Sequence, residues 1–145
     1  MLKILFDSSV LIAAFVESHP RHKTALSFLM KARDKEFELF ISSHSILEIY
    51  SVLTSAPFKP KITPLIAKQL IENNIKNFAK TIYLTDNDYF EIVEKMNISN
   101  LSGGIVYDAI IVECALKAKA DEILTLNAKD FLRLTKGTSI RVNAI

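Results

Sequence analysis

The sequence contains few of the residues that indicate a disulfide scaffold or a membrane span. Its 145 residues include one cysteine, three glycines and no tryptophan. Because Cys114 is alone, an internal disulfide and a cysteine zinc cluster are excluded. No apolar run approaches the roughly 20 residues that a membrane-spanning helix needs. The apolar stretch at the start is short and is interrupted by Asp7, so we expect no signal peptide, no membrane contact and a cytoplasmic location.

The composition is that of a globular protein with a substantial core. Half of the residues are apolar and 23% are charged, and the formal net charge is +2. This charge neither requires nor excludes nucleic acid as a partner. With no linker, repeat or low-complexity segment, residues 1–145 are expected to form one domain.

Short apolar runs alternate with segments that carry a helical spacing of apolar residues. This alternation predicts an α/β fold with a mainly parallel sheet. Helices are expected between the strands, including one that follows the pair Gly103-Gly104 and places Cys114 as a buried, inert thiol. About five strands are expected, at residues 3–6, 37–42, 81–84, 123–126 and 139–142, the last at an edge.

Acidic and amide side chains follow the predicted strands or begin the predicted helices. Asp7 follows the first strand, and Asn127 and Asp130 follow the fourth. Asp108 and Glu48 lie near helix starts, which face the carboxyl ends of the strands in such a fold. Each of these aspartates can also be explained as a helix cap or a turn residue. Together, however, clustered carboxylates repel one another unless a proton or cation neutralises them, and they typically bind Mg²⁺ or Mn²⁺.

Glu48 lies in the nearly unbroken apolar run Ile46-Leu47-Glu48-Ile49-Tyr50, where a buried, unpaired carboxylate would be costly. One explanation is a capping box formed with Ser45, which requires the helix to begin late. The other is that Glu48 points inward to a polar pocket, and we favour this second interpretation.

Four motifs, in this order, are similar to those of PIN-domain proteins, and among these to VapC-type toxins of toxin–antitoxin pairs. The similarity extends over nearly the whole chain. The motifs are Leu5-Phe6-Asp7-Ser8-Ser9-Val10-Leu11-Ile12, Ser45-Ile46-Leu47-Glu48-Ile49, Tyr107-Asp108-Ala109-Ile110-Ile111 and Ile123-Leu124-Thr125-Leu126-Asn127-Ala128-Lys129-Asp130-Phe131.

The resemblance implies a three-layer α/β/α fold and a Mg²⁺- or Mn²⁺-dependent RNA endonuclease. Its catalytic, metal-binding acids would be Asp7, Glu48 and Asp108. The family usually has a fourth acid where this chain has Asn127, so Asp130 is the candidate to take that role. Ser9 and Thr125 match small hydroxyl residues that the family places beside the acids, where they would support the metal ligands together with Asn127.

Several functions remain open on the sequence. The first is a ribonuclease toxin that has a cognate antitoxin and forms a homodimer, all implied by the resemblance. The alternatives are a housekeeping RNA-processing nuclease, a non-catalytic binding module favoured by Asn127, and, ranked last, a receiver-like phosphorelay domain. Basic side chains would contact the RNA phosphates, and the candidates are Arg21, Lys23, Lys59, Lys61, Lys129 and Arg133.

Overall fold

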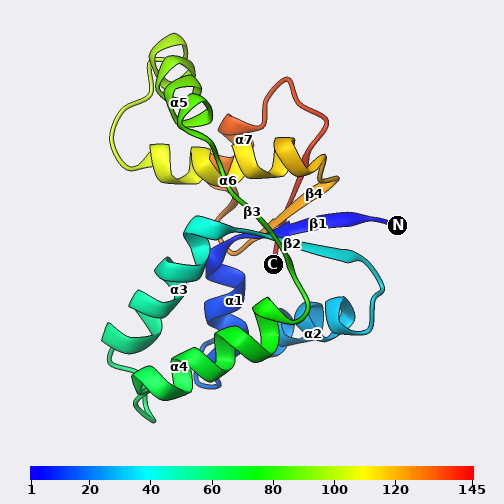
Figure 1. Cartoon of the computed structure of the whole chain (residues 1–145), viewed down its shortest axis with the longest axis vertical. Helices are drawn as coiled ribbons and strands as arrows, with labels where there is room; N and C mark the ends of the chain where they lie inside the picture. The colour runs from blue at the N-terminus through cyan, green and yellow to red at the C-terminus, as the bar shows by residue number, and fades with distance from the viewer.

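Five parallel strands form one sheet in the order β3-β2-β1-β4-β5 in the computed structural model, which describes residues 1–145 (Figure 1). The strands are β1 (Lys3–Phe6), β2 (Glu38–Ser42), β3 (Lys80–Ile82), β4 (Glu122–Thr125) and β5 (Arg141–Ala144). The central strand β1 pairs with β2 on one side and with β4 on the other. The five-stranded sheet is therefore confirmed, and it is entirely rather than mainly parallel. The last strand lies at an edge, as expected, but begins two residues later than predicted.

Seven α-helices surround the sheet. They are α1 (Ser8–Phe15), α2 (His22–Arg33), α3 (Ser43–Ser55), α4 (Pro64–Ile71), α5 (Asp86–Ile98), α6 (Ile105–Ala118) and α7 (Ala128–Leu134). A short π-helix, η1 (Glu72–Lys76), continues α4. Thr85 and Asp88 form the capping box that begins α5, since each side chain accepts a hydrogen bond from the other residue's backbone N–H. None of these helices has both the length and the apolar character needed to cross a bilayer.

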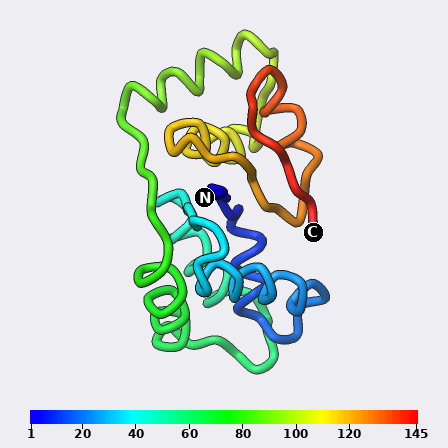
Figure 2. Tube along the Cα trace, turned by 90° about the vertical axis from the view of Figure 1, so that its right-hand side faces the viewer, coloured from blue at the N-terminus to red at the C-terminus, as the bar shows by residue number.

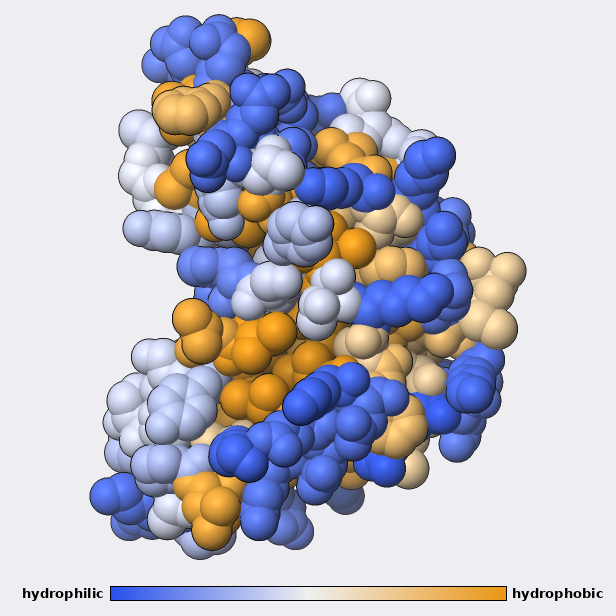
Figure 3. All heavy atoms as spheres, viewed as in Figure 1, coloured by the Kyte–Doolittle hydropathy of each residue, from blue (hydrophilic) through white to orange (hydrophobic).

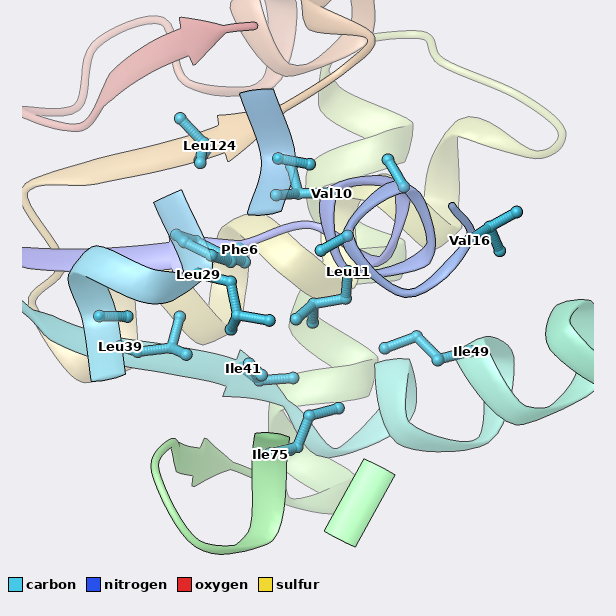
Figure 4. Packing of buried hydrophobic residues seen from close by; sticks show 14 of the residues in the cluster. Phe6, Val10, Leu11, Val16, Leu29, Leu39, Ile41, Ile49, Ile75 and Leu124 are labelled. Atoms are coloured by element: carbon cyan, nitrogen blue, oxygen red, sulfur yellow. The ribbon is translucent and has the colours of Figure 1, made fainter. Parts of the chain in front are cut away.

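Alternate residues of each central strand face two separate apolar clusters. In β1, Ile4 and Phe6 pack with α1, α2, α3 and α4, whereas Leu5 packs on the opposite face with α5, α6 and α7. Figure 2 shows these two groups of helices below and above the strands, and Figure 4 shows the first cluster. Fully burying a side chain such as Phe6 contributes roughly 1.5–3 kcal/mol, so both faces hold the sheet in place.

Helix α6 is more deeply buried than its spacing of apolar residues predicts. The sequence indicated one apolar face, but Ile110, Ile111 and Cys114 on other sides of the helix are buried as well. The reason is that α6 crosses β2, β3 and β4 while α5 and α7 pack on it from outside. The prediction that Cys114 is buried is confirmed.

The parallel topology brings several helix starts to one edge of the sheet. Helices α1 and α3 begin directly after β1 and β2, and α7 begins after the short turn that follows β4. Helix α6 leads back to the start of β4, so its own first turn lies at the carboxyl end of the strands. Asp7, Asp108 and Asp130 lie at these helix starts, and Glu48 lies in the second turn of α3.

Candidate active site

Asp7 lies at the end of β1, where its carboxylate is held by two hydroxyl groups. Ser9 Oγ and Thr125 Oγ1 donate hydrogen bonds to Asp7 Oδ2 over 2.8 and 2.9 Å. Burial raises the pKa of Asp7, and the two hydroxyls and the backbone amides of Ser8 and Ser9 only partly oppose this effect. The result is a carboxylate that is fixed in orientation and poorly solvated.

The same hydroxyls join the ends of the two central strands. The Ser9 hydroxyl accepts a hydrogen bond from the backbone N–H of Leu126 at 3.2 Å, and Thr125 Oγ1 accepts one from the N–H of Asn127 at 3.0 Å. Thr125 is fully buried. Ser9 and Thr125 therefore lie beside the acid, where the sequence placed them, and each makes a contact that also shapes the turn after β4.

Asp108 lies in the first turn of α6 and is partly buried. Burial, and then the charges of Asp7, Asp130 and Glu48, raise its pKa from 3.8 to about 6. The other three predicted acids are therefore close enough to Asp108 to act on it electrostatically. Of the ion pairs in the chain, none joins a Lys or Arg to Asp7 or Asp108.

Glu48 is not buried in a pocket, so our favoured interpretation of its orientation was wrong. Its side chain is 45% exposed, and Oε2 lies 3.6 Å from Nε2 of His44, one helical turn earlier. The capping box with Ser45 is also absent, because α3 begins at Ser43 and Ser45 Oγ is buried without a partner. The apolar neighbours of Glu48 in the sequence do not enclose it, because Ile46 is half-buried and Leu47 is exposed. Glu48 itself faces the solvent, near enough to Asp108 to raise its pKa.

Asp130 lies in the first turn of α7, and its Oδ1 is 3.7 Å from Arg133 Nη1. Asn127 precedes α7, is exposed, and does not cap the helix with its side chain. Of the basic residues proposed for RNA contact, Arg133 alone forms an ion pair with one of the four acids. Asp130 therefore adds negative charge to the acidic group. Asn127 contributes its backbone, whose N–H donates a hydrogen bond to Thr125.

The donor chemistry of this group fits a hard divalent cation, although its side chains are not closely assembled. No three His, Cys, Asp or Glu side chains stand where they could together hold a metal ion. Carboxylate oxygens are nevertheless the ligands that Mg²⁺ and Mn²⁺ prefer. Burial first, and then the charges of the other three acids, raise the pKa of Asp108, and neither Asp7 nor Asp108 has a Lys or Arg partner.

Two aromatic rings, which the sequence analysis did not select, lie beside the acids. The rings of His44 and Tyr107 are nearly parallel, at 10° between planes, with 6.2 Å between centroids. The spacing of His44 and Glu48, four residues apart on one helix, is the sequence signal that would have indicated the first of them. Figure 3 shows that the molecule is hollowed at the left, between the half with α5 and α6 and the half with α3 and α4.

Comparisons with known proteins place the chain in a family. Ribonuclease VapC27 from Mycobacterium tuberculosis is 27% identical over 123 residues, which cover 85% of this chain and 83% of that protein. The crystal structure of VapC20, a Sarcin-Ricin loop cleaving toxin from the same species, aligns with a TM-score of 0.70 at 14% identity, over 90% of this chain and 94% of the other.

A second solved structure, VapBC2 from Rickettsia felis bound to a DNA fragment from their promoter, aligns with a TM-score of 0.66 at 15% identity and covers 99% of both chains. At these identities the two structures establish the fold. The model of the PIN domain matches residues 4–137, which include every strand except the last and all the acids described above. The chain belongs to the PIN-domain family.

Proposed function

We propose that this protein is a divalent-metal-dependent RNA endonuclease and the toxin of a type II toxin–antitoxin pair. The observation that carries the proposal is the half-buried Asp7 carboxylate, which is oriented by Ser9 and Thr125 and acts electrostatically on Asp108. Neither aspartate has a Lys or Arg partner. Its relatives support the choice of substrate, since VapC27 is named a ribonuclease and VapC20 a toxin that cleaves the Sarcin-Ricin loop.

Asp7 and Asp108, together with Glu48 and Asp130, are the residues that would hold Mg²⁺ or Mn²⁺. When bound, such an ion supplies a water of lowered pKa and neutralises charge on a phosphodiester. The hydroxyls of Ser9 and Thr125 keep Asp7 in one orientation, which is the role of groups that support a ligand. Asp108 would give up its proton near neutral pH, because a nearby cation favours the carboxylate.

An apolar groove between α3 and α4 is our candidate for the antitoxin contact. It has a volume of about 420 Å³ and is lined by Ile46, Leu47, Tyr50 and Leu65, and Leu47 is 74% exposed. Apolar patches on a surface mark sites of protein contact, and an amphipathic helix fits such a groove. The groove is lined from the same helix, α3, that carries Glu48. The complex named VapBC2 supports a protein partner.

The outer face of α5 is our candidate for the contact between two copies of the chain. Helix α5 buries only Ile92 within the protein, while Phe90, Val93 and Ile98 are exposed, Phe90 to 74%. The helix stands out from the top of the molecule in Figure 1. Replacing Phe90 with Asp should convert a dimer to a monomer in light scattering; an unchanged mass would exclude this face.

The decisive test is cleavage of a structured RNA pool by purified protein with Mg²⁺, with Mn²⁺ and with EDTA. Asp108→Asn should lose the metal-dependent cleavage. Asp86→Asn is the matched control, because Asp86 is an exposed aspartate in the first turn of α5, outside the acidic group. The wild-type chain, but not Asp108→Asn, should also arrest growth when expressed without a partner.

The outcomes separate the functions left open by the sequence. Cleavage without growth arrest would favour a housekeeping RNA-processing nuclease. A folded protein that binds Mn²⁺ and RNA but cleaves nothing in the pool would favour the non-catalytic binding module that Asn127 suggested.

A further inference from the structure

The ring pair formed by His44 and Tyr107 joins the two helices that carry Glu48 and Asp108. His44 lies in the first turn of α3, and Tyr107 lies in the first turn of α6, directly before Asp108. Their centroid separation of 6.2 Å is within the range preferred by aromatic pairs. Tyr107 is 60% exposed, and His44 also has an exposed side chain, so the flat faces are open to solvent.

Both rings stand on helices that are packed into the fold. Nε2 of His44 lies 3.6 Å from Glu48, and Tyr107 belongs to a helix that is buried along most of its length. Large aromatic side chains are normally covered when they serve only the core. His44 and Tyr107 differ from the other exposed aromatic side chains in that their rings are nearly parallel to one another and their helices carry two of the acids, so the pair is available to a molecule bound at the site.

The charges around the rings indicate what that molecule needs. Four carboxylates surround the site, and the only Lys or Arg that pairs with any of them is Arg133, with Asp130. A polyanion such as RNA gains little affinity from this surface apart from a bound cation. Stacking of bases on aromatic rings does not depend on charge and is a main source of affinity for single strands.

We propose that Tyr107 and His44 form a stacking platform that holds one unpaired RNA base beside the bond to be cleaved. This inference rests on the proposed nuclease function and identifies its substrate as a locally single-stranded RNA. The platform positions the strand from a base while the acids act at the backbone. It also explains how an acidic site retains an acidic substrate. A duplex, whose bases are stacked on one another, would not use the platform.

The test is binding of a single-stranded RNA of about ten nucleotides that carries 2-aminopurine, a fluorescent base that is quenched when it stacks. The protein carries Asp108→Asn, so that no RNA is cut during the measurement. In this background Tyr107→Leu should weaken binding about tenfold and remove the quenching, as expected for loss of one stacked base. Tyr107→Phe should retain both, because the ring remains, and His44→Leu should show a smaller loss.

Tyr83→Leu provides the matched control. Tyr83 is 71% exposed, but it packs on Lys117 and not on the acidic group, so binding and quenching should be unchanged. Replacing the fluorescent base with an abasic site should weaken RNA binding by the Asp108→Asn protein. It should also abolish the difference in RNA affinity between this protein and its Tyr107→Leu variant. Equal binding and equal quenching for the Tyr107 and Leu forms would overturn the platform.

Failure of this inference can be distinguished from failure of the nuclease function. If the wild-type chain cleaves RNA but Tyr107→Leu cleaves with an unchanged KM, the platform is wrong and the nuclease stands. If the wild-type chain never cleaves RNA but binding depends on Tyr107, the platform stands without catalysis. Loss of binding to a protein partner alone, with RNA binding unchanged, would assign the rings to a protein interface and overturn the proposal.

Discussion

The two halves of the candidate site differ in how firmly they hold their carboxylates. At the ends of β1 and β4, Asp7 is half-buried and accepts two hydroxyl hydrogen bonds from Ser9 and Thr125. On the helices, Glu48 and Asp130 are partly exposed, and each is paired over more than 3.5 Å with a side chain of its own helix. The carboxylate at the strand ends, which we call the strand half, is held in one orientation. The carboxylates of Glu48 and Asp130, which we call the helix half, are free to adjust.

This difference suggests that the two halves have different roles in binding a cation. A pinned and poorly solvated carboxylate offers a cation a fixed anchor and gains most when its charge is neutralised. Exposed carboxylates with weak partners can turn toward the same cation at little cost, because surface ion pairs are worth only about 0–1 kcal/mol. We expect the strand half to decide whether a cation is held correctly and the helix half to complete its ligands.

The largest effect should come from comparing Asp7→Asn with Glu48→Gln. Loss of a fixed ligand should lower metal-dependent RNA cleavage by more than the roughly 10–100-fold that is typical of groups that only support a ligand. Asp7→Asn should remain inactive at any Mn²⁺ concentration, whereas Glu48→Gln should weaken Mn²⁺ binding and recover at high concentration. Cleavage rates measured across a Mn²⁺ titration test this difference.

Both variants should fold, since Asn at position 7 replaces a carboxylate whose burial is unfavourable and Glu48 is on the surface. Thermal melting verifies this. Undiminished cleavage by Asp7→Asn would remove Asp7 from the site, and equal behaviour of the two variants would remove the proposed distinction between the halves.

Thr125→Val should lower cleavage by roughly 10–100-fold, because it removes one of the hydroxyls that orient Asp7. It also deprives the backbone N–H of Asn127 of its acceptor, which should reduce the free energy of unfolding by about 1–3 kcal/mol. Thr125→Ser keeps the hydroxyl and should keep most of the activity. A Val variant as active as the Ser variant would show that Asp7 needs no orientation by Thr125.

Asp108→Asn should stabilise the protein at pH 7.5 in EDTA. Under these conditions the Asp108 carboxylate is charged although it is partly buried, and no divalent cation relieves its repulsion by the other acids. Because the folded state raises the pKa of Asp108 from 3.8 to about 6, it retains a proton that the unfolded chain releases. Stability of the wild-type protein therefore falls as the pH rises through this window, and the variant avoids the loss. Allowing for the exposed part of the side chain, we expect a gain of about 1 kcal/mol, or roughly 2–4 °C in Tm.

The pH dependence is the control for this prediction. At pH 4 the Asp108 side chain carries a proton in the folded wild-type protein, so the gain should disappear there. A gain that persisted unchanged from pH 4 to pH 7.5 would contradict the electrostatic cause.

The sequence was sufficient for the fold because its strands and helices differ sharply in apolar pattern. Runs such as Lys3–Phe6 are buried on both faces, and a local signal such as the capping box of Thr85 and Asp88 begins a helix. Strand ends were less well predicted: β5 begins at Arg141 rather than residue 139. Its side chains are mostly exposed at the sheet edge, so burial gives little signal there.

The sequence also placed the acids at one edge of the sheet, but it could not orient them. Glu48 has apolar neighbours in sequence, yet successive residues of a helix point in different directions, so those neighbours did not predict its exposure. The pair of His44 and Tyr107 joins residues 63 positions apart, since 107 − 44 = 63, and the two rings meet because α3 and α6 both begin at the same edge of the sheet. Long-range contacts of this kind leave no local pattern.

The smallest effect should come from Arg133→Ala in the helix half. Its guanidinium lies 3.7 Å from Asp130 on the surface, so the free energy of unfolding should change by less than about 0.5 kcal/mol. Without this cation beside it, Asp130 should be freer to turn toward a divalent ion, and Mn²⁺ affinity in calorimetry should rise slightly. Lys129→Ala, one turn away on the same helix and without an ion pair, is the control. Weaker Mn²⁺ binding in Arg133→Ala would mean that Arg133 holds Asp130 in place, and Asp130 would then belong with the pinned carboxylate Asp7.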